Sequence, residues 1–104
     1  MRVIVSKQVR DSLVDFYAHA MQKHPTLDEV VVQAKIDRVI SGLNQLGLFP
    51  EKYPYARYKS EWIKQRYRDY CCEDIHFGYK KVRIETGEIV VVVFDACHSL
   101  LFHD

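Results

Sequence analysis

The chain has 104 residues and a formal net charge of +1, with 48% hydrophobic and 28% charged residues. A chain of this length forms one domain with a substantial core and is too short for two. The near-neutral charge excludes a strong electrostatic field around the whole molecule. We therefore predict a single domain spanning residues 1–104, with the composition of an ordinary soluble globular protein.

The sequence predicts a cytoplasmic protein that has no membrane partner. The longest apolar run, Ile89 to Phe94, is far shorter than the roughly 20 residues of a membrane span. The N-terminus becomes polar too early for a signal peptide. The chain has 3 cysteines, of which Cys71 and Cys72 are adjacent. An odd number of cysteines argues against a disulfide framework.

A strand followed by a helix is predicted at the N-terminus. Residues 2–5 form a short apolar run, and Ser6 after it is a typical helix N-cap. The helix is expected to end at Lys23-His24-Pro25, because the residue before a proline is pushed out of the helical region. Its apolar positions follow the spacing of one helical face; they are Val9, Leu13, Phe16, Tyr17, Ala20 and Met21.

A second helix is predicted to begin at a capping box, Thr26 to Glu29. Gly42 is expected to weaken its interior, and Gly47 is expected to follow its end as the C′ residue. The two helices should form an antiparallel hairpin. The positions predicted to face inward are Leu27, Val30, Val31, Ala34, Ile40, Leu43 and Leu46.

The middle of the chain is predicted to contain a loop, a turn and a strand. Residues 48–54 contain two prolines and indicate a loop, and a helical turn is predicted from Tyr55 to Lys59. A strand is predicted from Trp62 to Cys72, because its apolar and basic residues alternate. In such a strand, Arg66 and Arg68 would project together from one face.

The segment from Lys52 to Arg68 is locally basic, with six basic residues and one acid, and aromatic residues are interleaved with its charges. One interpretation is a nucleic-acid site that combines phosphate contacts with base stacking. The other is a solvated face whose aromatic residues belong partly to the core, and charge alone favours this second interpretation.

Two further strands are predicted between Ile75 and His98. In the first, Ile75, Phe77 and Tyr79 alternate with polar residues, and the change of phase at Lys80-Lys81 indicates a β-bulge. Residues 85–88 contain a glycine and predict a hairpin turn. The continuously apolar second strand should be covered on both faces or lie at the centre of the sheet.

The predicted order is therefore β-α-α-β-β-β. It describes an α+β fold with an N-terminal strand, an antiparallel helical hairpin and a mainly antiparallel three-strand sheet. The hairpin is expected to lie on one face of the sheet.

Several pieces of the chain, taken in order, suggest a family. They are Val3-Ile4-Val5-Ser6, Asp11-Ser12-Leu13 with Phe16-Tyr17, Leu46 and Pro50 in the pattern Leu-x-x-x-Pro followed by Tyr53-Pro54, an arginine at 66 or 68, Phe77-Gly78-Tyr79, and Ile89 to His98. In this order and spacing, across nearly the full length, they resemble the RelE/ParE superfamily of type II toxin–antitoxin toxins.

The resemblance implies a toxin whose partner is a cognate antitoxin protein. Ribosome-dependent ribonucleases of this superfamily cleave mRNA in the ribosomal A site, whereas ParE-like relatives bind DNA gyrase and have no nuclease site. Three alternatives follow: an endoribonuclease acting on ribosome-bound mRNA, a non-enzymatic protein that poisons a target, and a non-toxic interaction domain. Leu100 stands where many relatives carry an arginine, and Phe102 replaces a terminal tyrosine.

For the ribonuclease alternative, the resemblance implies attack of a 2′-hydroxyl on the scissile phosphate. This chemistry needs a proton acceptor, a cation and a proton donor, but no metal or other cofactor. The implied catalytic residues are Arg66 and Arg68 as phosphate clamps and His98 as acid or base, with His103 as a second candidate. The residues expected to bind RNA phosphates are Lys64, Lys80, Lys81 and Arg83.

Two further groups of residues bear on possible metal and partner sites. Cys72, His76, Cys97 and His98 match no known spacing of zinc ligands, so no metal site is predicted. The apolar residues Leu100, Leu101 and Phe102 are unusual close to a chain end. Either they fold back onto the sheet or they form the partner-binding surface that an antitoxin covers.

Overall fold

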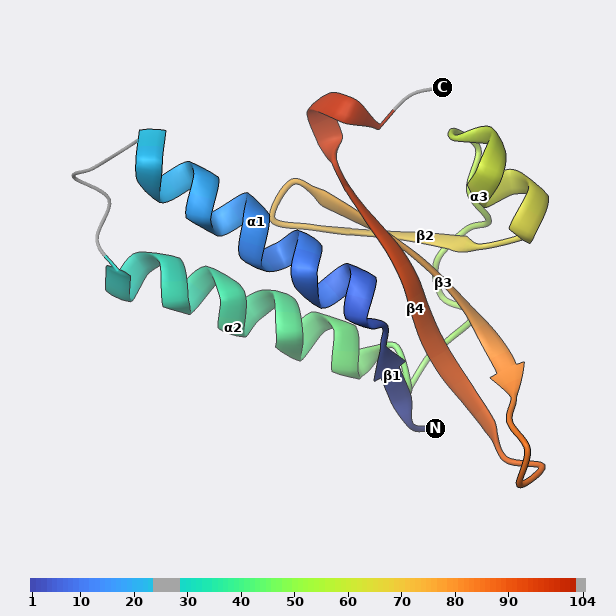
Figure 1. Ribbon diagram of the computed structural model, residues 1–104. Coiled ribbons are helices and arrows are strands. Elements are labelled where there is room, and N and C mark those ends of the chain that lie inside the picture. The colour runs from blue at the N-terminus through green and yellow to red at the C-terminus, as the bar shows by residue number, and fades with distance from the viewer. Residues whose placement is uncertain (24–28, 103–104) are drawn as a thin grey trace.

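A computed structural model of the protein describes residues 1–23 and 29–102 (Figure 1). Its elements are β1 (Val3–Val5), α1 (Lys7–Lys23), α2 (Glu29–Gln45), α3 (Ser60–Gln65), β2 (Arg68–Cys72), β3 (Ile75–Arg83), β4 (Ile89–His98) and the 3-10 helix η1 (Ser99–Leu101). The predicted α+β class is confirmed. The predicted capping box and the expected stop at His24-Pro25 lie outside the described residues.

The sheet has four strands in the order β1-β4-β3-β2. β1 pairs with β4 in parallel, and the remaining pairs are antiparallel. The expectation of a three-strand, mainly antiparallel sheet was therefore incomplete, because the N-terminal strand joins it and makes it mixed. This position leaves β4 in the interior of the sheet, where Val90, Val91 and Val93 are fully buried, as the apolar run predicts.

Ser6 joins the first strand to the first helix. Its hydroxyl oxygen accepts a hydrogen bond from the Val9 amide at 3.3 Å, which confirms the predicted N-cap. The same hydroxyl donates to the Phe94 carbonyl at 3.3 Å, and the Ser6 amide donates to the Val93 carbonyl at 3.1 Å. Ser6 therefore both caps α1 and holds the start of this helix against β4.

The two long helices run side by side in opposite directions and cover one face of the sheet (Figure 1). The predicted hairpin arrangement is thus present. On the sheet side the core is built by Phe77, Tyr79, Val91 and Val93, and on the helix side by Val9, Leu13, Val39, Leu43 and Leu46. The short helix α3 lies across the other face, where Trp62 packs against Gly78.

The predicted inward face of α2 was only partly correct. Leu43 and Leu46 are buried as expected, but Val30, Val31, Ala34 and Ile40 are exposed. Val32 and Val39 are buried instead. Apolar residues lie on more than one side of this helix, so its pattern is compatible with more than one orientation. Contact with α1 and the sheet selects the face that contains Val39 and Leu43.

Gly47 serves a different purpose from the one predicted. Among the described glycines only Gly87 has a positive φ, so Gly47 is not a left-handed C′ residue. A Cβ at position 47 would lie 2.0 Å from the Met1 carbonyl oxygen and 3.1 Å from Val3 Cγ2. The missing side chain therefore lets the end of α2 contact the start of the chain.

Gly42 faces the Tyr70 hydroxyl, and this contact can be tested. A Cβ at position 42 would lie 2.1 Å from that oxygen. We expect Gly42→Ala to destabilise the protein, although alanine favours a helix by about 1 kcal/mol. In a Tyr70→Phe background the clash is relieved, so the same substitution should be less harmful by at least about 1 kcal/mol. Urea unfolding of the four proteins measures this coupling, and additive effects would contradict the contact.

The β3–β4 hairpin is present and its turn is the predicted one. Gly87 has a φ of 87°, and its amide donates to the Ile84 carbonyl at 2.8 Å. The predicted position of the bulge was wrong. The register shifts between Gly78 and Tyr79, which pair with Asp95 and Val93, so the extra residue is Phe94 on β4. Lys80 and Lys81 continue the regular alternation of β3.

The prediction for residues 55–72 was also wrong in two places. Trp62 to Gln65 belong to helix α3, and the strand begins only at Arg68. Tyr55 forms no helical turn but pairs with Arg68 in an isolated antiparallel bridge. A short alternating run fits a strand and one helical turn equally well, and here burial of Trp62 against the sheet decides for the helix. No helix in the described residues is long and apolar enough to cross a membrane.

Candidate functional site

Basic side chains gather around a cavity of about 300 Å³ beside the sheet. Its walls come from the loop after α2, the end of α3, the start of β2 and the middle of β3. We call it the basic pocket. It is lined by Pro50, Glu51, Tyr55, Gln65, Arg66, Arg68, Lys80 and Lys81. Four of the predicted site residues, Arg66, Arg68, Lys80 and Lys81, therefore lie together.

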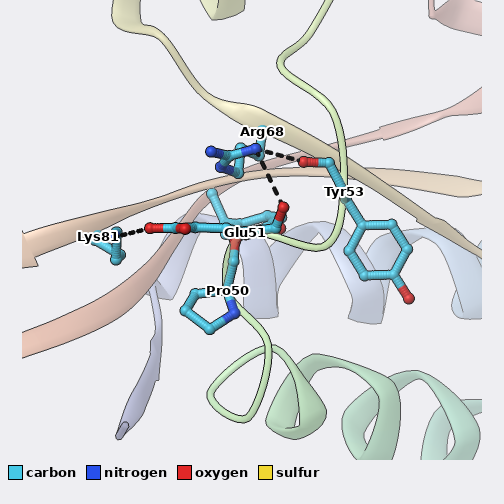
Figure 2. A network of polar contacts seen from close by, with 6 residues as sticks. Pro50, Glu51, Tyr53, Arg68 and Lys81 are labelled. Carbon is cyan, nitrogen blue, oxygen red and sulfur yellow. Dashed lines mark hydrogen bonds and ion pairs between the residues drawn. The ribbon is translucent and has the colours of Figure 1, made fainter.

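Arg68 both lines the pocket and holds the loop that forms its wall. One guanidinium nitrogen, Nη1, donates to the Tyr53 carbonyl at 2.7 Å and, more weakly, to the Glu51 carbonyl at 3.5 Å (Figure 2). The guanidinium also lies 4.2 Å from the centre of the Tyr55 ring. Among the described residues its other nitrogens have no hydrogen-bond partner, so they remain available to an anion.

Arg66 reaches the same ring from the end of α3. It caps that helix with a φ of 61°, in the left-handed region that arginine seldom adopts. Its side chain is exposed, and its guanidinium lies 5.6 Å from the centre of the Tyr55 ring. The exposed guanidinium at this cap therefore lies beside the pocket that Arg66 lines.

The two lysines have intramolecular partners. Lys80 Nζ donates to the Gln65 carbonyl at 3.3 Å and lies 5.6 Å from the ring of Tyr67. Lys81 forms an ion pair with Glu51 (Figure 2), and this hydrogen bond holds the pKa of the Glu51 carboxyl below its usual value. Glu51 is the acid among the described residues lining the basic pocket. Sequence reasoning missed it, since no local pattern relates a loop residue to Lys81.

Tyr79 on β3 holds the loop after α2 in place. Its hydroxyl donates to the Pro50 carbonyl at 2.9 Å, and its ring is fully buried. Burial raises the pKa of this phenol to about 12. The hydrogen bond places Pro50, and hence the neighbouring Glu51, over the middle of β3.

Stability at high pH is expected to depend on Tyr79. An unfolded tyrosine ionises near pH 10, whereas the pKa of folded Tyr79 is about 12. The contribution is complete below about pH 10 and is lost as the pH rises toward 12, at up to about 1.4 kcal/mol per pH unit. Tyr79→Phe should therefore lose stability less steeply than the wild type in urea unfolding between pH 9 and 11. Tyr58→Phe, at an exposed site, is the control, and equal slopes for all three proteins would contradict the assignment.

His98 does not join the arginines. On β4 it pairs with Ile75, whereas Lys80 pairs with Val92, six positions earlier along the strand, a separation of roughly 20 Å. His98 Nδ1 accepts a hydrogen bond from the Leu100 amide at 3.2 Å, and its ring contacts Phe16 of α1 edge-on. The structure thus places His98 at the opposite end of the sheet from the basic pocket.

Lys64 and Arg83 also lie outside the basic pocket. The Lys64 side chain is exposed on α3, and Arg83 donates to the Gly87 carbonyl at 3.2 Å in the β3–β4 turn. His103 lies outside the described residues. The site that the structure assembles is thus smaller than the predicted one.

The C-terminal apolar residues separate into two groups. Leu100 and Leu101 are exposed. Phe102 stacks on His76 with ring centres 3.9 Å apart and also packs against Trp62. Beneath it, His76 Nδ1 lies 2.8 Å from Asp69 Oδ1. The fold-back alternative holds for Phe102, and the two leucines remain open to a partner.

The cysteines and histidines at 72, 76, 97 and 98, which were not predicted to bind zinc, form no metal-ligand cluster in the described part of the chain. No three histidine, cysteine or acidic side chains come together there as metal ligands would. Comparison of the sequence with known protein families and with curated proteins finds no match. The functional proposal therefore depends on the basic pocket and on the sequence motifs.

Proposed function

We propose that this protein is a RelE/ParE-like toxin of a type II toxin–antitoxin system, and that its basic pocket binds RNA phosphates. The observation that carries the proposal is the convergence of Arg66, Arg68, Lys80 and Lys81 on one cavity. Guanidinium groups bind phosphate through paired, charge-assisted hydrogen bonds. Tyr55 adds an aromatic ring beside both arginines, as expected for a site that also contacts bases.

The family part of the proposal has separate support. The sequence motifs resemble those of RelE/ParE toxins, and the chain folds as a strand, a helix pair and then strands. The additional helix α3 interrupts the expected order. A cognate antitoxin is the proposed partner, and the exposed side chains of Leu100 and Leu101 are candidates for its contact. The proposed location is the cytoplasm, where ribosomes and mRNA meet.

For the reaction we propose cleavage of ribosome-bound mRNA through attack by the 2′-hydroxyl on the adjacent phosphorus. The new P–O2′ bond gives a 2′,3′-cyclic phosphate, the P–O5′ bond breaks, and the proton lost by the 2′-oxygen is balanced by the one that the leaving 5′-oxygen takes up. Arg66 and Arg68 would neutralise the charge that develops on the phosphate. The second candidate is a toxin that binds its target without chemistry, as the ParE-like relatives do. The position of His98 favours this candidate, since an acid or base must come within hydrogen-bonding distance of the reacting atoms.

The proposal is tested by tightly controlled expression in a bacterial host. Growth is recorded, and primer extension on an abundant mRNA detects cleavage. We expect growth arrest with new cuts inside translated codons, and loss of both effects in an Arg66→Ala variant. His98→Ala should behave as the wild type if this histidine lies outside the site. Arrest without cuts would replace the ribonuclease by the second candidate, and soluble protein without arrest would overturn the toxin proposal.

A further inference from the structure

A second, more apolar cavity adjoins the basic pocket. Its volume is about 670 Å³, and it is lined by Met1, Leu48, Phe49, Pro50, Glu51, Lys52 and Lys81. Pro50, Glu51 and Lys81 also line the basic pocket, so the two cavities share a wall. A ligand that carries an anionic group and a flat apolar group could therefore occupy both cavities at once.

Phe49 provides an open aromatic surface in this second cavity. Its side chain is 66% exposed, although it belongs to a loop that Arg68 and Tyr79 hold in place. A large exposed apolar residue on a fixed loop is available for stacking. Bases of single-stranded RNA are typically stacked on such rings while their phosphates contact basic side chains.

Glu51 lines both the Phe49 cavity and the basic pocket. Its carboxylate is exposed, ionised and oriented by Lys81 through one oxygen, Oε1. A carboxylate has about four acceptor positions on its two oxygens, so an oriented carboxylate can accept further hydrogen bonds. On the Watson–Crick edge of the bases, only guanine offers two neighbouring donors, N1–H and the N2 amino group.

We propose that the Phe49 cavity is a base-binding subsite selective for guanine, next to a phosphate held in the basic pocket. Phe49 stacks on the base, and Glu51 accepts hydrogen bonds from N1–H and N2 of guanine. Adenine and cytosine each present one amino group beside a ring nitrogen that accepts hydrogen bonds. This nitrogen would face a carboxylate oxygen, which is also an acceptor, and the two would repel each other. This inference depends on the proposed RNA-binding function and assigns its specificity to two residues.

Equilibrium binding of the full chain to short fluorescent oligouridines tests the subsite. The oligonucleotides differ in one central base, which is guanine, adenine, cytosine or uracil. We expect the guanine oligonucleotide to bind about tenfold more tightly than the others, as for other bidentate base contacts. Glu51→Gln should bind the adenine, cytosine and uracil oligonucleotides at least as tightly, because a negative charge is removed, but should lose the preference for guanine. A purely structural role of Glu51 would weaken all four equally and leave the ratio unchanged.

Phe49→Leu keeps the apolar character but removes the ring, and is expected to weaken the guanine complex severalfold. Tyr58→Leu is the matched control, because it removes an exposed ring that lines neither cavity, and it should have little effect. If the wild type binds the oligonucleotides without base preference, or if Glu51→Gln keeps the preference, the subsite is wrong while RNA binding stands. If no oligonucleotide binds even at low salt, both the subsite and the proposed RNA binding are overturned.

Discussion

Replacement of Trp62 by alanine is expected to lower the free energy of unfolding by about 3–5 kcal/mol, the usual cost of removing a buried aromatic side chain. Trp62 is 0% exposed, and its indole nitrogen donates to Asp95 Oδ2 at 2.8 Å. It also packs against Gly78, where a Cβ would lie 3.1 Å from the indole. Trp62 is the buried residue of α3, and Lys80 bonds the end of this helix at the Gln65 carbonyl, so the loss of Trp62 should also loosen the placement of Arg66 beside the basic pocket.

Urea unfolding, monitored by circular dichroism, measures this change in the free energy of unfolding. Trp62→Phe is the informative companion, because it keeps a ring and removes the hydrogen bond to Asp95. Asp95 retains Gln8 and the Ala96 amide as partners, so this variant should lose less, about 1–3 kcal/mol. A loss below about 1 kcal/mol for Trp62→Ala would show that α3 is not anchored through this side chain.

Charge reversal at Arg66 is expected to weaken RNA binding by at least about tenfold. Arg66 lines the basic pocket and has an exposed guanidinium beside Tyr55. Arg66→Glu removes a phosphate contact and adds repulsion. Lys64→Glu changes the net charge by the same amount two residues earlier, on α3, but Lys64 does not line the pocket. Salt screens interactions between exposed charges that are not in direct contact, so the control should lose less.

Affinity for a short single-stranded RNA, measured at several salt concentrations, separates the two variants. Arg66→Glu should also reduce the salt dependence of binding, because fewer counterions are released. Equal losses for the two variants would mean that RNA responds to overall charge, and the basic pocket would then not be the binding site. Arg68 is less suitable for this test, since its hydrogen bond to Tyr53 also supports the loop.

Part of the fold followed from local rules that operate within a few residues. Ser6 was identified as an N-cap because a hydroxyl at that place satisfies a free amide. Residues 85–88 were identified as a turn because Gly87 tolerates a positive φ. Continuous apolar character from Ile89 to Phe94 predicted a strand covered on both faces or placed at the sheet centre, and β4 lies between β1 and β3. For the cap and the turn, the cause and its effect lie in the same short segment.

The candidate site was predicted in composition but not in extent. The sequence identified Arg66, Arg68, Lys80 and Lys81, and they line one cavity. It could not show that His98 lies apart from them, because this depends on the pairing register of β3 with β4. It also did not identify Glu51 or Phe49, whose positions depend on hydrogen bonds to the loop from side chains that are distant in sequence.

The sequence by itself determined the α+β class, the helix pair, the β3–β4 hairpin and the identity of the basic residues, because periodicity, capping and turn chemistry are local. Tertiary structure decided which face of α2 is buried, that Trp62 lies on a helix and that β1 pairs with β4. Each of these choices was between local conformations of similar energy. Burial against the rest of the chain then selected one of them, and the same contacts brought the basic pocket together.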